Sequence, residues 1–84
     1  MVKMVYFAWI RERIGKGEET LDLPDDVQTV GDLIAYLKTC GEGYAAAFNV
    51  PEAVHVAINK QHCGHGDAIG EATEIALFPP MTGG

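Results

Sequence analysis

The sequence predicts an α+β domain in which a mixed β-sheet is covered on one face by one main helix and a short second helix. Two strand-like segments precede the strongest helical pattern, and two more follow it. That order favours helices segregated on one side of a sheet. A chain of 84 residues with 48% apolar composition is enough for one modest core but not for two domains.

The first strand-like segment covers residues 2–10, which are rich in β-branched and aromatic side chains. This composition predicts a central strand. Gly15 and Gly17 predict a turn, and the alternation of polar and apolar side chains over residues 19–23 predicts a second strand. We therefore expect these two strands to form a hairpin.

The main helix is predicted by an apolar pattern at i, i+3, i+4 and i+7, and by a capping box formed by Thr29 and Asp32. The apolar positions are Val30, Leu33, Ile34 and Leu37. The pattern is expected to end near Gly41. It must cover the sheet, because four buried side chains of this kind contribute about 1.5–3 kcal/mol each.

A short second helix is predicted around Tyr44 and Phe48, which lie four residues apart in an alanine-rich run that Pro51 terminates. Residues 53–58 and 73–78 then read as two more strands, with a less regular glycine-rich strand or loop between them. The order ββαβ(β)β indicates a ubiquitin-like β-grasp fold. We expect a β-grasp domain over residues 1–78 and a flexible C-terminal tail over residues 79–84.

The charge balance restricts the possible partners. Six Lys and Arg against 12 Asp and Glu give a net charge of -6, which disfavours nucleic acid and anionic lipid. The longest apolar run, residues 4–10, is too short to cross a bilayer, and charged residues follow it where a signal peptide would be cleaved. We expect a cytoplasmic chain with a protein partner.

The C-terminal tail carries the most specific chemistry. It consists of Pro79, Pro80, Met81, Thr82, Gly83 and Gly84. The prolines favour an extended exit from the last strand, and the glycines allow the terminal backbone to enter a narrow channel in a partner. Composition alone fits a frayed chain end equally well. A free carboxylate needs activation, and the chain has no phosphate-binding loop, so ATP would have to be used by a separate activating enzyme.

Two segments carry a family resemblance: Val5-Tyr6-Phe7-Ala8-x-x-Arg11-Glu12-x-x-Gly15, and Ala57-Ile58-Asn59 followed by Ala76 through Gly84. With them the chain resembles, over essentially its whole length, the family of molybdopterin synthase small subunits. The resemblance implies a β-grasp fold and a terminal Gly84 that is adenylated by a ubiquitin-activating-like enzyme and then thiocarboxylated. It further implies a sulfur-donating subunit that is not an enzyme by itself and holds no stable cofactor.

The same resemblance implies a large subunit as partner. That subunit would accept the tail and use its sulfur on cyclic pyranopterin monophosphate, with two carriers on a dimeric large subunit forming a heterotetramer. It also implies a docking patch beside the tail that includes Phe7 and Phe78, and a contact between Arg11 and the activating enzyme. The alternatives are plain core residues for the two Phe side chains and a solvated surface side chain for Arg11.

One segment departs from the family pattern. His62 lies where a hydrophobic docking residue is common, which suggests a more polar or pH-sensitive interface there. His62, Cys63 and His65 could bind metal, with His55 elsewhere, but their spacing does not match the paired ligands of structural zinc sites. We expect no metal site and interpret this segment as a loop with exposed imidazoles.

Three other functions fit the same sequence features. A thiamine-type sulfur carrier would share the fold, the tail and the activation, although the Phe-Pro-Pro-x-Thr lead-in speaks against it. A ubiquitin-like protein modifier would join its tail to lysines of targets. A β-grasp interaction module would leave the tail idle.

Overall fold

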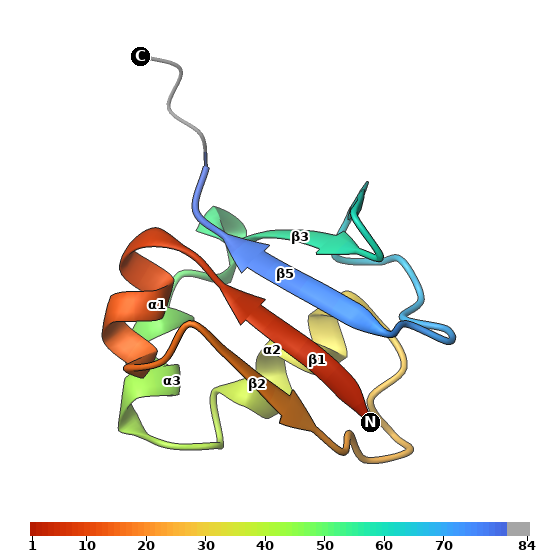
Figure 1. Ribbon diagram of the computed structural model, residues 1–84, viewed down its shortest axis with the longest axis horizontal. Coiled ribbons are helices and arrows are strands. Elements are labelled where there is room, and N and C mark those ends of the chain that lie inside the picture. The colour runs from red at the N-terminus through yellow and green to blue at the C-terminus, as the bar shows by residue number, and fades with distance from the viewer. Residues whose placement is uncertain (81–84) are drawn as a thin grey trace.

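A five-stranded mixed sheet forms the centre of the computed structural model, which describes residues 1–80 (Figure 1). The strands lie in the order β2-β1-β5-β3-β4. β1 and β5 are parallel, whereas every other neighbouring pair is antiparallel. The bounds are β1 Val2–Tyr6, β2 Glu18–Leu21, β3 His55–Ile58, β4 Gln61–Cys63 and β5 Glu74–Phe78.

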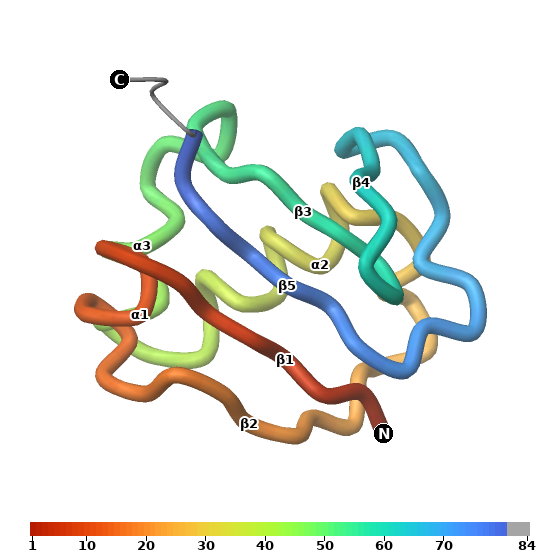
Figure 2. The backbone as a smooth tube through the Cα atoms, turned by 45° about the horizontal axis from the view of Figure 1, so that its top comes forward, coloured from red at the N-terminus to blue at the C-terminus, as the bar shows by residue number. Residues whose placement is uncertain are grey.

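In the described part of the chain, three α-helices accompany the sheet: α1 Ala8–Ile14, α2 Val30–Leu37 and α3 Glu42–Ala47, with a 3-10 turn at Pro51–Ala53. Figures 1 and 2 show α2 crossing behind the sheet, and α1 and α3 together at the end toward which β1 and β5 point. Within residues 1–80, no helix lies over the face of the sheet opposite α2 in either view. This is the predicted α+β, ubiquitin-like β-grasp arrangement, with α1 as a further helix that the sequence did not predict.

The core lies between the sheet and α2, because each central strand turns alternate side chains toward that helix. Residues with at most 2% exposure make up most of it: Met4, Tyr6, Val56, Ile75 and Leu77 from the strands, and Val30, Leu33, Ile34 and Leu37 from α2. The Asp32 N–H donates to Thr29 Oγ1 at 3.1 Å, and the Thr29 N–H donates to Asp32 Oδ2 at 3.2 Å. The predicted apolar face and capping box are thus confirmed, although α2 ends at Leu37 rather than near Gly41.

The strand predicted over residues 2–10 ends at Tyr6, so the prediction is wrong for residues 7–10. Ala8 adopts a left-handed conformation with φ 53°, which turns the chain out of the sheet and into α1. Ile10 is then fully buried, and Ile14 packs against the core one helical turn later. Gly15, predicted as a turn, is the left-handed C-cap of α1 with φ 93°. β1 and β2 are antiparallel neighbours, but a helix joins them instead of a hairpin turn.

The remaining elements differ from the predictions at their ends. The second strand covers Glu18–Leu21 rather than residues 19–23, and the last begins at Glu74 rather than at residue 73. The strand predicted over residues 53–58 begins only at His55, because Pro51 starts a 3-10 turn that includes Ala53. The second helix is confirmed as α3, and the glycine-rich segment contains the short strand β4. Of the predicted tail, Pro79 and Pro80 are described, whereas residues 81–84 lie outside the described part of the chain.

The β3–β4 turn contains two left-handed residues, Asn59 with φ 50° and Lys60 with φ 69°. Two-residue hairpins of this kind strongly favour glycine at the second position. We expect Lys60→Gly to raise the free energy of unfolding by about 0.5–1 kcal/mol, because it removes most of the left-handed strain. Urea unfolding would measure the change.

Asn59→Gly is the matched control for this turn. The Asn59 side-chain oxygen accepts hydrogen bonds from the backbone N–H groups of Thr73 and Glu74, both at 3.0 Å. Replacing it should therefore destabilise the protein even though glycine suits the backbone there. A loss of stability in Lys60→Gly would contradict the strain argument.

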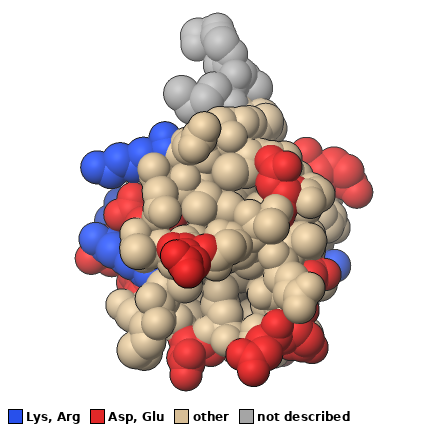
Figure 3. Space-filling view, turned by 90° about the vertical axis from the view of Figure 1, so that its right-hand side faces the viewer, with Lys and Arg blue, Asp and Glu red and all other residues tan. Residues whose placement is uncertain are grey.

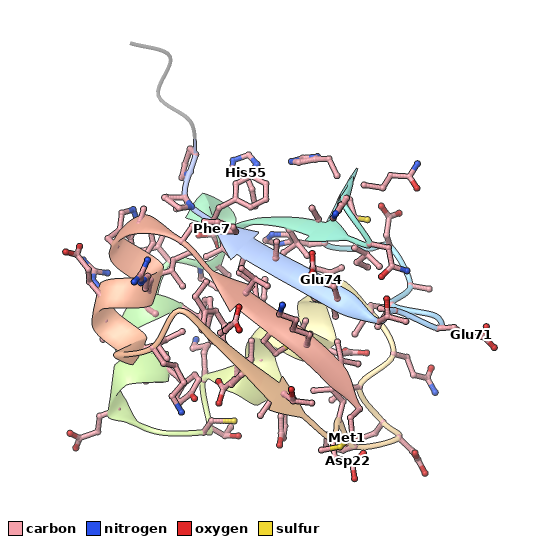
Figure 4. All side chains as sticks on the ribbon, viewed as in Figure 1. Met1, Phe7, Asp22, His55, Glu71 and Glu74 are labelled. Atoms are coloured by element: carbon pink, nitrogen blue, oxygen red, sulfur yellow. The ribbon has the colours of Figure 1, made fainter. Side chains whose placement is uncertain are left out.

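Charge is unevenly distributed over the molecule. Figure 3 looks at the right-hand end of Figure 1, where several acidic side chains stand out, and Figure 4 places Asp22 and Glu71 toward this end. Helix α1, at the opposite end, carries Arg11 and Arg13 with Glu12 between them. No helix within residues 1–80 combines the length and hydrophobicity needed to cross a bilayer.

Candidate functional site

The described end of the chain leaves the sheet beside an exposed aromatic side chain. Because β1 and β5 are parallel, both strands end at the same edge, and the Phe7 N–H donates to the Leu77 carbonyl at 3.2 Å. Phe7 is 47% exposed, and Phe78 is partly exposed at the end of β5. Pro79 and Pro80 follow directly. The structure therefore brings together the predicted docking residues Phe7 and Phe78 and the start of the tail.

An apolar patch surrounds this point on the helix-free face of the sheet. Residues of this face alternate with the buried ones, so the strand register places Ala57 opposite both Ala76 and His62. We name as the tail-side patch the side chains of Val5, Phe7, His55, Ala57, His62, Ala76 and Phe78, which are partly or fully exposed. A contiguous apolar surface beside a chain end is typical of a docking site.

Two histidines, His55 on β3 and His62 on β4, border the patch on the side of these strands. His55 lies directly opposite Phe78 in the antiparallel register, and their rings stack with centroids 5.8 Å apart and planes at 20°. His55 Nδ1 is 3.3 Å from His62 Nε2, and the His62 ring centroid is 6.0 Å from that of Phe78. Phe78 and His62, both predicted as partner contacts, are thus neighbours.

His55 was missed as a site residue from the sequence. It lies two positions before Ala57, and residues two apart in a strand share a face. This spacing is the signal in the sequence that could have placed His55 on the patch. Figure 4 shows His55 and Phe7 near the end of β5, whereas Glu74 lies farther back along the strand. The sequence did not reveal that β3 and β5 are neighbours in this register.

Arg11 lies on α1, outside the patch. Its backbone N–H donates to the Phe7 carbonyl at 3.3 Å, which places it one helical turn beyond Phe7, and its side chain is exposed. Within residues 1–80 no ion pair involves Arg11. The exposed Arg11 guanidinium is available to an acidic group of a partner. Its contact with the activating enzyme stays a prediction.

The other predicted metal-capable residues have separate roles. His65 Nε2 donates to the Val54 carbonyl at 2.7 Å, which ties the loop after β4 to the start of β3. The Cys63 thiol donates to the Gln61 carbonyl at 3.1 Å and belongs to the opposite face of the sheet from His62. Among residues 1–80, no three His, Cys, Asp or Glu side chains converge on a point where they could hold an ion.

The reactive group itself lies outside the described residues. Met81, Thr82, Gly83 and Gly84 were predicted to insert into a partner and carry the chemistry, and these predictions stay untested by the structure. What the geometry adds is the location from which they start: the edge of the tail-side patch, next to Phe78.

Comparisons with known proteins cover nearly the whole chain. A model of the ThiS family matches residues 4–84. The molybdopterin synthase sulfur carrier subunit of Haemophilus influenzae is 34% identical over 84 residues, which cover 100% of both chains. Thus the resemblance seen in the sequence is confirmed.

Two solved structures show the same fold. A putative molybdopterin converting factor, subunit 1, from Pyrococcus furiosus is 26% identical, with 94% of this chain and 95% of the other covered and a TM-score of 0.72. SAMP1, the small archaeal modifier protein 1 of Haloferax volcanii, is 27% identical, with 99% and 98% covered and a TM-score of 0.70. The first is named for molybdopterin chemistry and the second for protein modification.

Proposed function

The chain belongs to the ThiS family, and from this premise we propose that it is a sulfur carrier in molybdenum cofactor biosynthesis. The terminal carboxylate of Gly84 is its reacting group. A separate activating enzyme adenylates the carboxylate with ATP and releases pyrophosphate, and sulfide-level sulfur from a donor then displaces AMP to leave a thiocarboxylate. The chain supplies the acyl group and no catalytic machinery of its own.

The sulfur then passes to cyclic pyranopterin monophosphate within molybdopterin synthase. A thiocarboxylate is anionic and soft at neutral pH, so it is a better nucleophile than the carboxylate that it replaces. Gly83 and Thr82 lead the sulfur into the active site of the large subunit, where acid and base groups reside. Two carriers serve one dimeric large subunit in the cytoplasm.

The observation that carries this proposal is the location of Pro79 and Pro80, from which the tail starts. Phe7 is exposed and Phe78 is partly exposed at the end of β5, directly before Pro79. Both lie on a face of the sheet that no helix within residues 1–80 covers. A large subunit that docks on the tail-side patch would receive the tail directly. The full-length similarity to the Haemophilus influenzae sulfur carrier subunit supports the same assignment.

A second candidate is a protein modifier, which the similarity to SAMP1 over 99% of the chain favours. Activation would be the same, but the acyl group would then be transferred to a lysine amine and not to sulfur. The two functions share fold, tail and activating chemistry. Only the product separates them.

Intact mass spectrometry distinguishes the products. The purified chain would be incubated with ATP, its activating enzyme and a sulfur donor. We expect a mass increase equal to the replacement of one oxygen by sulfur, and no increase in a variant that lacks Gly84. That deletion should leave the unfolding curve unchanged. Adducts on lysines of other proteins without any thiocarboxylate would favour the modifier, and no activation at all would overturn both.

A further inference from the structure

The two histidines of the tail-side patch form a hydrogen-bonded pair on a surface that is otherwise apolar. His55 belongs to β3 and His62 to β4, and their facing nitrogens are 3.3 Å apart. Within residues 1–80, the outward nitrogens, His55 Nε2 and His62 Nδ1, make no hydrogen bond. When a partner buries this patch, both outward nitrogens need hydrogen-bond partners from it, because an unsatisfied buried polar group is costly.

The contact limits how many protons the pair can hold. One N–H must lie between the two facing nitrogens, donated by one ring and accepted by the other. The neutral pair then presents one outward donor and one outward acceptor. A single added proton converts the outward acceptor into a donor and preserves the inner hydrogen bond. A second added proton would set two N–H groups against each other and break the contact.

The pair has no charged partner within the described chain. The strands packed against it are β3, β4 and β5, and their other titratable side chains are Cys63, which belongs to the opposite face, and Glu74, at the far end of β5. Lys60 lies in the β3–β4 turn, and His65 is bonded to the Val54 carbonyl. Neither histidine takes part in an ion pair within residues 1–80. The positive charge of an added proton on the pair would therefore be balanced only by a group of the partner.

We infer that the His55–His62 pair determines partner choice by requiring a carboxylate on the surface that packs over Phe78, and that the docked pair carries one added proton. This inference rests on the proposed function, since it assumes that the tail-side patch is where the large subunit binds. A carboxylate only accepts hydrogen bonds, so it matches a pair with two outward donors. In the desolvated centre of an interface such a charge-assisted contact discriminates strongly against apolar surfaces that lack the acceptor.

If the docked pair carries an added proton, docking takes up that proton from solution, and the affinity depends on pH. Complex formation favours the protonated pair, so the dissociation constant should fall as pH falls through the imidazole range. One proton limits the change to about tenfold per pH unit. The dissociation constant for the purified cognate large subunit would be measured by calorimetry from pH 8.5 to pH 6.5, with buffers of different ionisation enthalpy to count the protons taken up.

Two variants isolate the pair. The double variant His55→Gln/His62→Gln keeps polar side chains on the patch but cannot take a proton there, so its dissociation constant should be independent of pH across this range. His65→Gln alters a histidine that is outside the patch and should keep the pH dependence of the native chain. Equal affinity of the native chain at both ends of the range, weaker binding at low pH, or retained pH dependence in the double variant would each overturn the inference.

Failure of the inference can be told apart from failure of the proposed function. If the thiocarboxylate forms and the large subunit binds without proton uptake, only the role of the histidine pair is wrong. If the large subunit does not bind at any pH, the docking partner is wrong, and with it both the proposed function and the inference.

Discussion

Glu19→Ala is expected to lower the free energy of unfolding by about 2–4 kcal/mol, since it leaves two tyrosine hydroxyls without their acceptor. Glu19 Oε2 accepts hydrogen bonds from the Tyr6 and Tyr44 hydroxyls, both at 2.6 Å. Tyr6 is only 1% exposed, so water cannot readily replace the carboxylate. These bonds join β1, β2 and α3, and chemical denaturation would measure their loss.

A double-mutant cycle tests whether the three side chains act as one network. In a background that carries Tyr6→Phe and Tyr44→Phe, no hydroxyl remains to be left unpaired, so Glu19→Ala should cost much less than it does in the native chain. The aromatic packing of the two rings, 6.5 Å apart and nearly perpendicular, is retained in that background. Equal costs in the two backgrounds would mean that the hydrogen bonds contribute nothing to stability.

The same carboxylate makes this stability depend on pH. Partial burial would raise the pKa of Glu19, but hydrogen bonds from Tyr44, Tyr6 and Lys16 outweigh it and hold the pKa below its ordinary value of 4.5. A group whose pKa is lowered by folding stabilises the protein above its unfolded pKa, and this contribution is lost as pH falls through the folded pKa. The native chain should therefore lose stability below about pH 5 more steeply than Glu19→Gln does.

The sequence predicted the parts of the fold that depend on local periodicity. The spacing of the apolar residues of α2 and the capping box at Thr29 are local signals, and the structure confirms both. Ala8 shows where such signals fail. Its left-handed backbone ends β1 and begins α1, yet alanine carries no mark of that conformation as glycine would. An unbroken apolar run over residues 4–10 then reads as one strand, although Ile10 reaches the core from a helix.

The candidate site was predicted only where side-chain type or family pattern marked it. Phe7, Phe78 and His62 were each named from the sequence, but nothing local indicates that His55 lies against both Phe78 and His62. That contact depends on β5 lying between β1 and β3, a pairing between segments far apart in the chain. Glu19 is similar, because its role follows from Tyr6 and Tyr44, which only the tertiary structure brings to one carboxylate.

Phe7→Asp is expected to weaken binding of the large subunit at least about 30-fold, because aromatic side chains at the centre of an interface contribute 2 kcal/mol or more. The substitution also introduces a charge that docking would bury without a counter-ion. Phe7 is 47% exposed and lies outside the core, so only part of its apolar burial is lost and the free energy of unfolding should fall by no more than about 1.5 kcal/mol. A large binding loss with an intact fold is the signature of a docking residue.

Ala35→Asp is the matched control, since it adds the same charge to the exposed surface of α2, away from the helix-free face of the sheet. It should leave the dissociation constant within about twofold, because exposed charges far from an interface act weakly through screened solvent. If both substitutions weakened binding equally, net charge and not the tail-side patch would control the affinity. If Phe7→Asp bound as tightly as the native chain, the large subunit would have to approach the tail from another face of the sheet.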